Sequence, residues 1–495
     1  HTFALVARHP GNASKALGWL FGEPAAALPG LGRKLPHYGK YSFLGFEGTE
    51  PVNVLKGQWP ESGSPLRVDL RPGARRGTPL PSPAPEARRA LAELPPAFSQ
   101  KRLAAHVAAL ADPMLEGRGL GTEGERKAAG YVAAEMKAAG LAPAGDEGGF
   151  LQRFRVERTG AGAPAEVANV AGLLPGTDPA WKEQSVVVVA HFDHLGRGWP
   201  DARKEFQGQV HPGADDNASG VAVLLELARA MKDEKPRRTV VFLAVTGEEA
   251  GRLGSKRWVA GPSARAAAGT IAAVNLDTVG RLGDGRLQVL GTGTAGEWVH
   301  AVRGASWVTG VETKAVAETL ESSDHVSFVE AGIPAVQLFT GPHGDYHRPG
   351  DSAGKVDVPG LAKVAAVTKE LVSWLAGREE PLAVAIAPRA DAQAAPAASA
   401  ASAAAPPARR VSFGTMPDFA FEGPGVKVGG VVPGSPAEKA GLKTGDVVLK
   451  LDGKEVANLR DFSEKLKGMN PGQEVTVTLS RDGMETVVPV VLVER

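Results

Sequence analysis

Imidazole and carboxylate side chains gather in one part of this chain. Seven of the eleven histidines lie between positions 191 and 347, and the 495 residues include no cysteine. A metal ion would therefore have to be held by nitrogen and oxygen atoms, which excludes thiolate zinc sites and iron–sulfur clusters. The motifs that could supply such ligands are His191-Phe192-Asp193-His194, Gly213-Ala214-Asp215-Asp216-Asn217-Ala218-Ser219-Gly220, Thr246-Gly247-Glu248-Glu249, Asn275-Leu276-Asp277, and the run from His343 to Asp351.

Each motif alone could consist of ordinary polar loop residues or of residues that cap a helix. Their placement changes this interpretation, because three of them follow short apolar runs that predict buried strands over 185–190, 239–245 and 271–276. Open α/β sheets place their ligand crevice at the carboxyl ends of such strands. Histidines and carboxylates without sulfur suit zinc, and five ligands with one shared carboxylate would suit two ions.

The elements around these motifs predict the fold class. Helical patterns over 103–110, 123–139 and from Gly220 onward alternate with the strands. We therefore expect an α/β fold with a mixed, mostly parallel sheet sandwiched by helices.

The stretch from about 98 to 378 resembles the M28 family of dinuclear zinc aminopeptidases, which also contains some carboxypeptidases. Besides the motifs above, the resemblance rests on Glu116-Gly117-Arg118, Gly251-Arg252-Leu253-Gly254-Ser255, Ser323-Asp324-His325 and Tyr346-His347-Arg348-Pro349-Gly350-Asp351. It implies the zinc exopeptidase fold and two Zn²⁺ ions per chain. The metal ligands that it implies are His191, Asp215, Glu249, Asp277 and His347.

The resemblance also implies a role for each of these side chains. Asp215 would bridge the ions, with His191 and Asp277 on one and Glu249 and His347 on the other, and Glu248 would be the general base. Asp193 would orient His191 from behind, and Tyr346 would donate to the oxyanion, a core packing role being its alternative. A non-proline cis bond is expected between Asp215 and Asp216. His325 is expected to make structural hydrogen bonds, while His194, His211 and His343 receive no role.

The last 85 or so residues resemble a bacterial PDZ domain. The resemblance rests on Gly434-Ser435-Pro436-Ala437 through Gly445-Asp446 and on Leu451-Asp452-Gly453-Lys454-Glu455-Val456. It implies a β-rich unit that binds the end of a peptide chain as an added strand. The alternative is that this unit only packs against the rest of the protein or acts as a lid. Residues 388–410, almost wholly Ala, Pro and Ser, read as a tether. The expected domains are thus an N-terminal extension over 1–97, a peptidase-like domain over 98–380, this linker, and a PDZ-like domain over 411–495.

Composition limits the partners and the location that can be expected for this protein. The formal net charge is +1, which gives no argument for nucleic acid as a partner, and no apolar run is long enough to span a membrane. The expected substrates are peptides or proteins and the expected location is secreted, periplasmic or at the cell envelope. Two alternatives stay open: a glutaminyl-cyclase-like acyltransferase with a single zinc, and a catalytically inactive peptide-binding protein.

Overall fold

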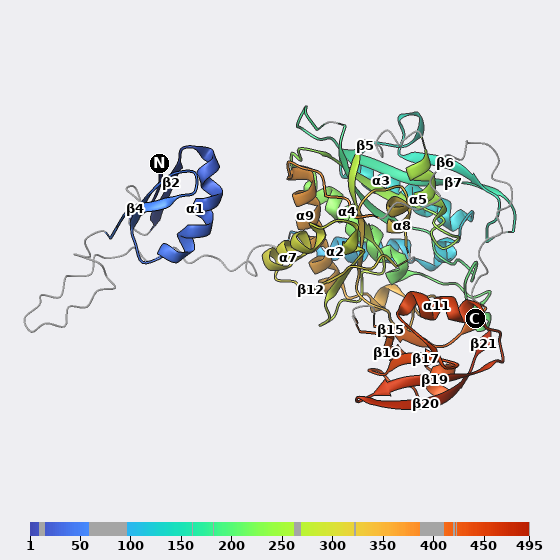
Figure 1. Cartoon of the computed structure of the whole chain (residues 1–495). Helices are drawn as coiled ribbons and strands as arrows, with labels where there is room; N and C mark the ends of the chain where they lie inside the picture. The colour runs from blue at the N-terminus through green and yellow to red at the C-terminus, as the bar shows by residue number, and fades with distance from the viewer. Residues whose placement is uncertain are drawn as a thin grey trace, which may run out of the picture. The chain divides into compact units, whose positions relative to one another are not determined.

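A computed structural model describes residues 1–8, 15–58, 97–160, 162–181, 183–261, 269–320, 323–386, 410–418, 421 and 423–494 (Figure 1). The chain divides into two compact units, His1–Pro96 and Ala97–Arg495. The predicted linker, except for its last residue, lies outside the described residues. Among the described helices, none combines the length and the apolarity that crossing a bilayer requires.

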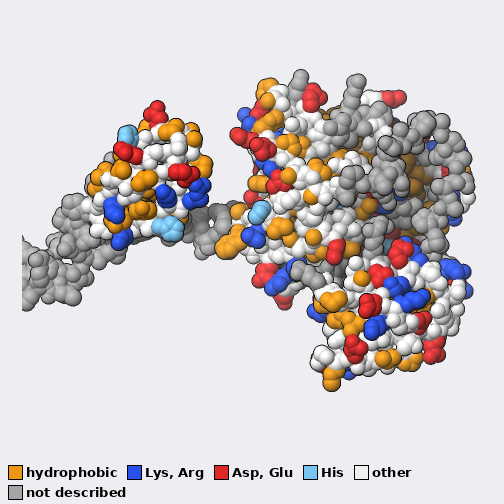
Figure 2. Space-filling view, in the orientation of Figure 1, with side chains coloured by type: hydrophobic (Ala, Val, Ile, Leu, Met, Phe, Trp, Pro, Cys, Tyr) orange, Lys and Arg blue, Asp and Glu red, His pale blue; other side chains and the backbone are white. Residues whose placement is uncertain are grey.

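The first unit is an antiparallel sheet that one short helix covers. Its strand order is β2-β1-β3-β4, and its buried cluster comprises Ala4, Leu31, Leu44 and Phe46. The opposite face leaves large apolar side chains such as Trp19 in solvent, and Figure 2 shows apolar side chains on the surface of this unit. The elements are β1 (Thr2–Arg8), β2 (Ala16–Gly22), α1 (Leu28–Lys34), β3 (Phe43–Glu47) and β4 (Val52–Gly57).

A nine-stranded mixed sheet dominates the second unit, in the order β12-β11-β13-β10-β8-β9-β7-β5, with β6 paired to β7. The four central strands β13, β10, β8 and β9 are mutually parallel, whereas β7 joins β9 and β11 joins β13 in antiparallel pairs. The prediction of a mixed α/β sheet is confirmed, with the parallel part at its centre. The strands are β5 (Ala142–Pro143), β6 (Leu151–Val156), β7 (Ala165–Leu174), β8 (Ser185–His191), β9 (Thr239–Val245), β10 (Thr270–Leu276), β11 (Leu287–Leu290), β12 (Thr313–Val316) and β13 (Ala335–Phe339).

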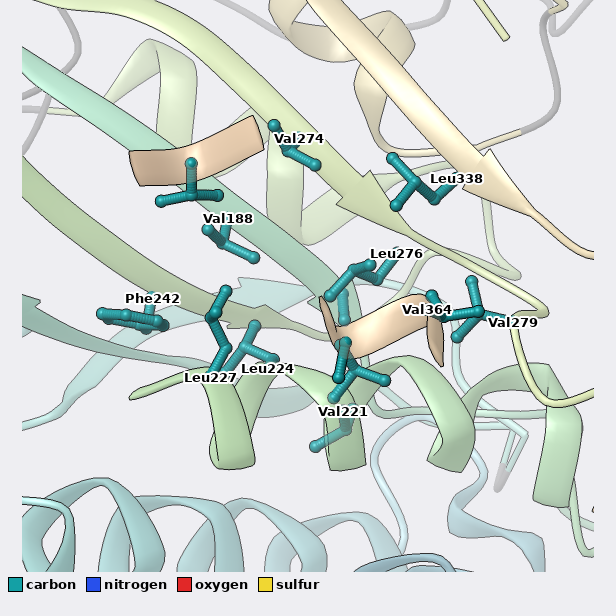
Figure 3. Close-up of a cluster of buried hydrophobic side chains, with 14 of the residues drawn as sticks. Val188, Val221, Leu224, Leu227, Phe242, Val274, Leu276, Val279, Leu338 and Val364 are labelled. Atoms are coloured by element: carbon teal, nitrogen blue, oxygen red, sulfur yellow. The ribbon is translucent and has the colours of Figure 1, made fainter. Parts of the chain in front are cut away.

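Helices cover both faces of this sheet because its central strands are apolar on both sides. Val186 and Val188 of β8 face the core formed with α2, α3, α4, α7 and α9, whereas Val187 and Val189 face α5 and α8. In Figure 3, side chains of α4 pack beneath Val188 of β8 and its neighbouring strands. The helices are α2 (Gln100–Leu110), α3 (Glu123–Ala138), α4 (Gly220–Met231), α5 (Leu253–Ala260), α7 (Trp298–Thr309), α8 (His325–Glu330) and α9 (Val358–Gly377).

The C-terminal residues have a hydrophobic core of their own, built around Phe413, Phe462 and the inward side chains of a small antiparallel sheet. The rings of Phe413 and Phe462 meet edge to face at 5.2 Å between centroids. A tight turn at Asp452-Gly453, both with positive φ, connects β17 to β18. The elements are β14 (Val411–Ser412), β15 (Thr415–Pro417), β16 (Val426–Val431), α10 (Pro436–Lys439), β17 (Val447–Leu451), β18 (Lys454–Glu455), α11 (Leu459–Lys467), β19 (Glu474–Arg481), β20 (Met484–Val491) and β21 (Val493–Glu494).

Candidate metal centre

The four parallel strands end at one edge of the sheet and carry the motif residues to it. His191 is the last residue of β8, Asp277 directly follows β10, and Glu248 and Glu249 follow β9 by a short turn. The loop after β13 carries His347, and the turn before α4 carries the Asp215-Asp216 pair. The prediction that these motifs meet in space therefore agrees with the topology of the sheet.

Two groups of ligand atoms form at this edge. In the first, His191 Nε2 lies 3.3 Å from Asp216 Oδ1 and 3.4 Å from Asp277 Oδ1. In the second, His347 Nε2 lies 3.2 Å from both Asp216 Oδ2 and Glu249 Oε2. Asp216 thus offers one carboxylate oxygen to each group, which is the arrangement that two neighbouring ions need.

The bridging position predicted for Asp215 is wrong by one residue. Asp215 is fully buried, but its carboxylate points elsewhere: Oδ1 accepts hydrogen bonds from Ser219 Oγ at 3.0 Å and from Gly280 N at 2.5 Å. Its Oδ2 lies 3.1 Å from His343 Nε2. The cis bond is likewise displaced by one residue, to Asp216–Asn217. Because the hydrogen bonds of the turn fix the direction of each side chain, only the second of two adjacent acids faces the ligand groups.

His194 is a candidate ligand to which the sequence analysis gave no role. Its Nδ1 lies 2.7 Å from Glu249 Oε1 and 4.0 Å from Asp216 Oδ2, so it joins the second group. Its Nε2 is buried and has no hydrogen-bond partner among the described residues. The spacing from His191 to His194, just past the end of a strand, was the signal that could have identified it.

Charge crowding shifts the pKa values of the acids and histidines in both groups. For Glu249, burial alone would raise the pKa, but the charges of His347 and His194 hold it at about 2. Burial lowers the pKa of His191 and His347, yet the surrounding carboxylates outweigh this effect and raise both pKa values well above the usual range. The groups therefore attract positive charge strongly, as expected where opposite charges are held within about 4 Å in a buried site.

Asp193 and Glu248 lie directly behind and beside the ligands. Asp193 Oδ1 accepts the backbone N–H of Glu248 at 3.2 Å and lies 3.8 Å from His191 Nδ1, whereas the backbone oxygen of Asp193 is nearer to that nitrogen, at 3.2 Å. Burial raises the pKa of Asp193 to about 8. Burial also raises the pKa of Glu248 well above its usual value, and the carboxylates of Asp324, Glu249 and Asp277 add to this against the opposing charge of His191.

Tyr346 and His325 lie in contrasting surroundings. The ring of Tyr346 stacks on that of His347 with 3.9 Å between centroids, and 47% of the side chain is exposed. Loss of contact with water and four nearby carboxylates raise the pKa of Tyr346 well above 10, so the hydroxyl keeps its proton. His325, by contrast, is fully buried, and burial lowers its pKa to about 3, so it is a neutral ring.

The residues at this edge fit divalent zinc. The donor set contains imidazole nitrogens and carboxylate oxygens, both of which zinc accepts. Asp216 is 3% exposed and Asp277 is 6% exposed, so water does little to offset their charge. A divalent cation held by one of these ligand groups would offset the charge of its buried carboxylates.

Two family profiles and several known proteins match parts of this chain. Residues 169–372 match the profile of the family described as Peptidase family M28, and residues 409–492 match that of the PDZ domain. Aminopeptidase YwaD of Bacillus subtilis is 31% identical over 183 residues, which are 34% of this chain and 36% of that protein. A probable zinc metalloprotease of Pyrenophora teres f. teres is 38% identical over 117 residues, which are 24% of this chain and 23% of that protein.

The chain thus spans only about a quarter to a third of the length of these curated relatives. Among solved structures, that of BSAP, a zinc aminopeptidase from Bacillus subtilis, is 19% identical with a TM-score of 0.48, and the match covers 59% of this chain and 99% of that one. The structure of Bacteroides thetaiotaomicron glutaminyl cyclase bound to N-acetylhistamine is 20% identical with a TM-score of 0.46, covering 56% and 98%.

Proposed function

We propose that this protein is a zinc-dependent exopeptidase, because residues 169–372 match the profile of peptidase family M28 and residues 409–492 match that of the PDZ domain. Its activity is that of an aminopeptidase, which releases N-terminal residues from peptides. The observation that carries the proposal is the sharing of Asp216 between two ligand groups with Glu248 beside them.

Two zinc ions per chain would be held by side chains from all four central strand ends. His191, Asp216 and Asp277 would hold one ion, and Asp216, Glu249 and His347 the other, with His194 against Glu249. When bound, zinc lowers the pKa of water and stabilises negative charge on a carbonyl oxygen.

Glu248 performs the proton transfers in this proposal. Its carboxylate accepts a proton from the attacking water and later donates it to the nitrogen of the departing amine, as the C–N bond breaks. Burial and the neighbouring carboxylates raise the pKa of Glu248, so its carboxylate takes up a proton more readily than an exposed glutamate does. The hydrogen bond from the Glu248 amide to Asp193 holds the start of this turn beside His191.

Tyr346 supplies a neutral donor at the rim of the same site. Its hydroxyl remains protonated, so it can donate a hydrogen bond to the oxygen that becomes negative during attack. Stacking on His347 fixes the direction of the ring.

The other parts of the chain receive roles by the same proposal. Residues 1–97 form an extension, 98–380 the peptidase domain, 388–410 a tether and 411–495 a PDZ domain that takes the end of a peptide as an added strand. A secreted or periplasmic location is supported by a match of 42% identity over 66 residues, 13% of this chain, to a probable periplasmic serine endoprotease of the DegP type from Chlamydia pneumoniae.

The test uses the purified full chain on peptides with free or blocked ends. We expect hydrolysis of a peptide with a free amino end, loss of hydrolysis with a chelator, and recovery with zinc. Glu248→Gln should retain zinc and lose about 10²- to 10⁴-fold in kcat. The matched control is Glu312→Gln, an exposed carboxylate paired with Arg286 on the surface. Cleavage of the amino-blocked peptide at an equal rate, or an E248Q variant within tenfold of the wild type, would contradict the proposal.

A further inference from the structure

Arg118 is a fully buried cation whose donors all point at backbone carbonyls. Its Nε donates to Phe192 O at 2.7 Å, Nη1 donates to Pro212 O at 2.7 Å and also to Leu110 O, and Nη2 donates to Gly213 O at 2.9 Å. It has no exposed surface. Burying an arginine is costly unless its donors are hydrogen-bonded, and here the Nε and both Nη atoms have carbonyl acceptors.

Asp351 is the fully buried counterpart of Arg118 on the other side of the same turn. Its Oδ2 accepts the backbone N–H groups of both Asp215 and Asp216, at 2.9 and 3.0 Å. Its backbone oxygen accepts the N–H of Ala214 at 3.1 Å. The other carboxylate oxygen, Oδ1, accepts from Arg281 Nη2 at 3.2 Å.

Together the two residues hold five consecutive residues of the turn. Arg118 takes the carbonyls of Pro212 and Gly213, and Asp351 takes the amides of Ala214, Asp215 and Asp216. The turn ends at the residue whose two carboxylate oxygens face the two ligand groups. A small displacement of this backbone would therefore change both groups at once.

We propose that Arg118 and Asp351 act as a pair of positioning residues that set the place of the Asp216 carboxylate between the two ligand groups. The link to zinc binding rests on the proposed function. The hold of Arg118 and Asp351 on the turn rests only on their hydrogen bonds to residues 212–216. Asp351 also follows His347 by four residues, so it couples the turn before α4 to the loop after β13.

A matched control exists at the opposite end of the sheet. Arg238 is also fully buried, and it donates to Gln184 Oε1 at 2.6 Å, to Glu379 O at 2.8 Å and to Arg378 O. It immediately precedes β9, at the amino end of the strand whose carboxyl end leads to Glu248. Arg238→Met therefore removes a similar buried arginine without touching the turn.

The experiment compares R118M, R118K, D351N and R238M in the full chain, with circular dichroism to establish folding. Zinc affinity is measured by competition with a chromophoric chelator, and amide hydrogen exchange of residues 213–217 is measured in metal-free protein. We expect R118M and D351N to lose about 10- to 100-fold in zinc affinity, with faster exchange of this segment and a fall in kcat larger than the change in KM. R238M should unfold at a lower temperature but keep zinc affinity and exchange of the turn within about twofold of the wild type.

R118K tests whether the hold on the turn depends on the geometry of the guanidinium group or only on its positive charge. One ammonium group cannot reach four carbonyls that face a planar guanidinium, so we expect R118K to resemble R118M. Wild-type exchange and zinc affinity in R118K, or in R118M and D351N, would overturn the inference. If R118M does not fold, R118K and D351N give the same decision. If the wild type binds no zinc, the proposed function is refuted. Faster exchange in R118M and D351N would in that case still support the role of Arg118 and Asp351 in holding the turn.

Discussion

The assignment of the bridging carboxylate to Asp216, and not to its neighbour, can be tested by a pair of isosteric substitutions. Asp216→Asn replaces the carboxylate that faces both His191 and His347. Asp215→Asn changes a carboxylate that is bonded instead to Ser219, Gly280 and His343. The two variants differ by one position in the chain and carry the same chemical change, so each is the control for the other.

The size of the effect follows from the number of ligand groups that each side chain meets. Structural zinc in proteins is bound with roughly 10–16 kcal/mol, so one of about four ligands contributes about 3 kcal/mol, or on the order of a hundredfold in affinity. Since Asp216 belongs to both groups, we expect D216N to weaken both ions by about a hundredfold each. Asp215 lies in neither group, and D215N should weaken binding by less than about tenfold.

Zinc content after dialysis at fixed free zinc, together with chelator competition, measures both affinities. The expected result is two ions per chain in D215N and fewer than one in D216N at a free zinc concentration that saturates the wild type. A D216N protein that keeps two ions, with D215N losing them, would refute the reasoning and return the bridge to Asp215. Thermal melts of the metal-free proteins check that neither variant has lost its fold.

Two further predictions concern other groups near the site. Burial raises the pKa of Glu125, which is 1% exposed, to about 7, although hydrogen bonds from Thr246 and the Gly121 backbone oppose the rise. The folded state therefore holds the proton more tightly than the unfolded chain, in which the pKa of a glutamate is about 4.3. The free energy of unfolding should fall by up to about 3–4 kcal/mol as the pH rises from about 4.3 to 7. Glu125→Gln should remove this fall, so urea unfolding at pH 5 and pH 8 should differ less in the variant than in the wild type, and equal pH dependence of the two proteins would disprove the assignment. Tyr346→Phe should lower kcat by about 10²-fold at unchanged zinc content and nearly unchanged KM, because it removes one hydrogen-bond donor to the oxyanion. If steady-state assays show an unaltered kcat, Tyr346 has no role in catalysis and only packs against His347.

The central strands could be predicted from the sequence because they are buried on both faces. The run over 185–190 is continuous and apolar, and the structure places β8 at Ser185–His191. The run over 239–245 matches β9, Thr239–Val245, without change. In both cases the polar residue after the run marks the carboxyl end of the strand, which is why the position of the candidate site could be predicted.

The choice between Asp215 and Asp216 could not be made from the sequence. Both are acids in the same turn, and the side chain that faces the ligand groups is decided by backbone hydrogen bonds to Asp351, 135 residues or more further along the chain. His194 was missed for a similar reason, because only the fold brings Glu249 to within 2.7 Å of it. Strand β2 (Ala16–Gly22) escaped prediction because it is exposed along almost its whole length and shows no alternation of apolar and polar residues.

The candidate ligands come from strand ends and loops spread over positions 191 to 347, and this spread has a consequence for biosynthesis. A nascent polypeptide that has emerged only as far as β10 lacks β13, and with it His347 and Asp351. Such an intermediate can offer neither the complete second ligand group nor the hydrogen bonds that hold the turn before α4. The proposed peptidase activity would therefore arise only once nearly all of the α/β unit has been translated and folded, so a partly synthesised chain would lack it.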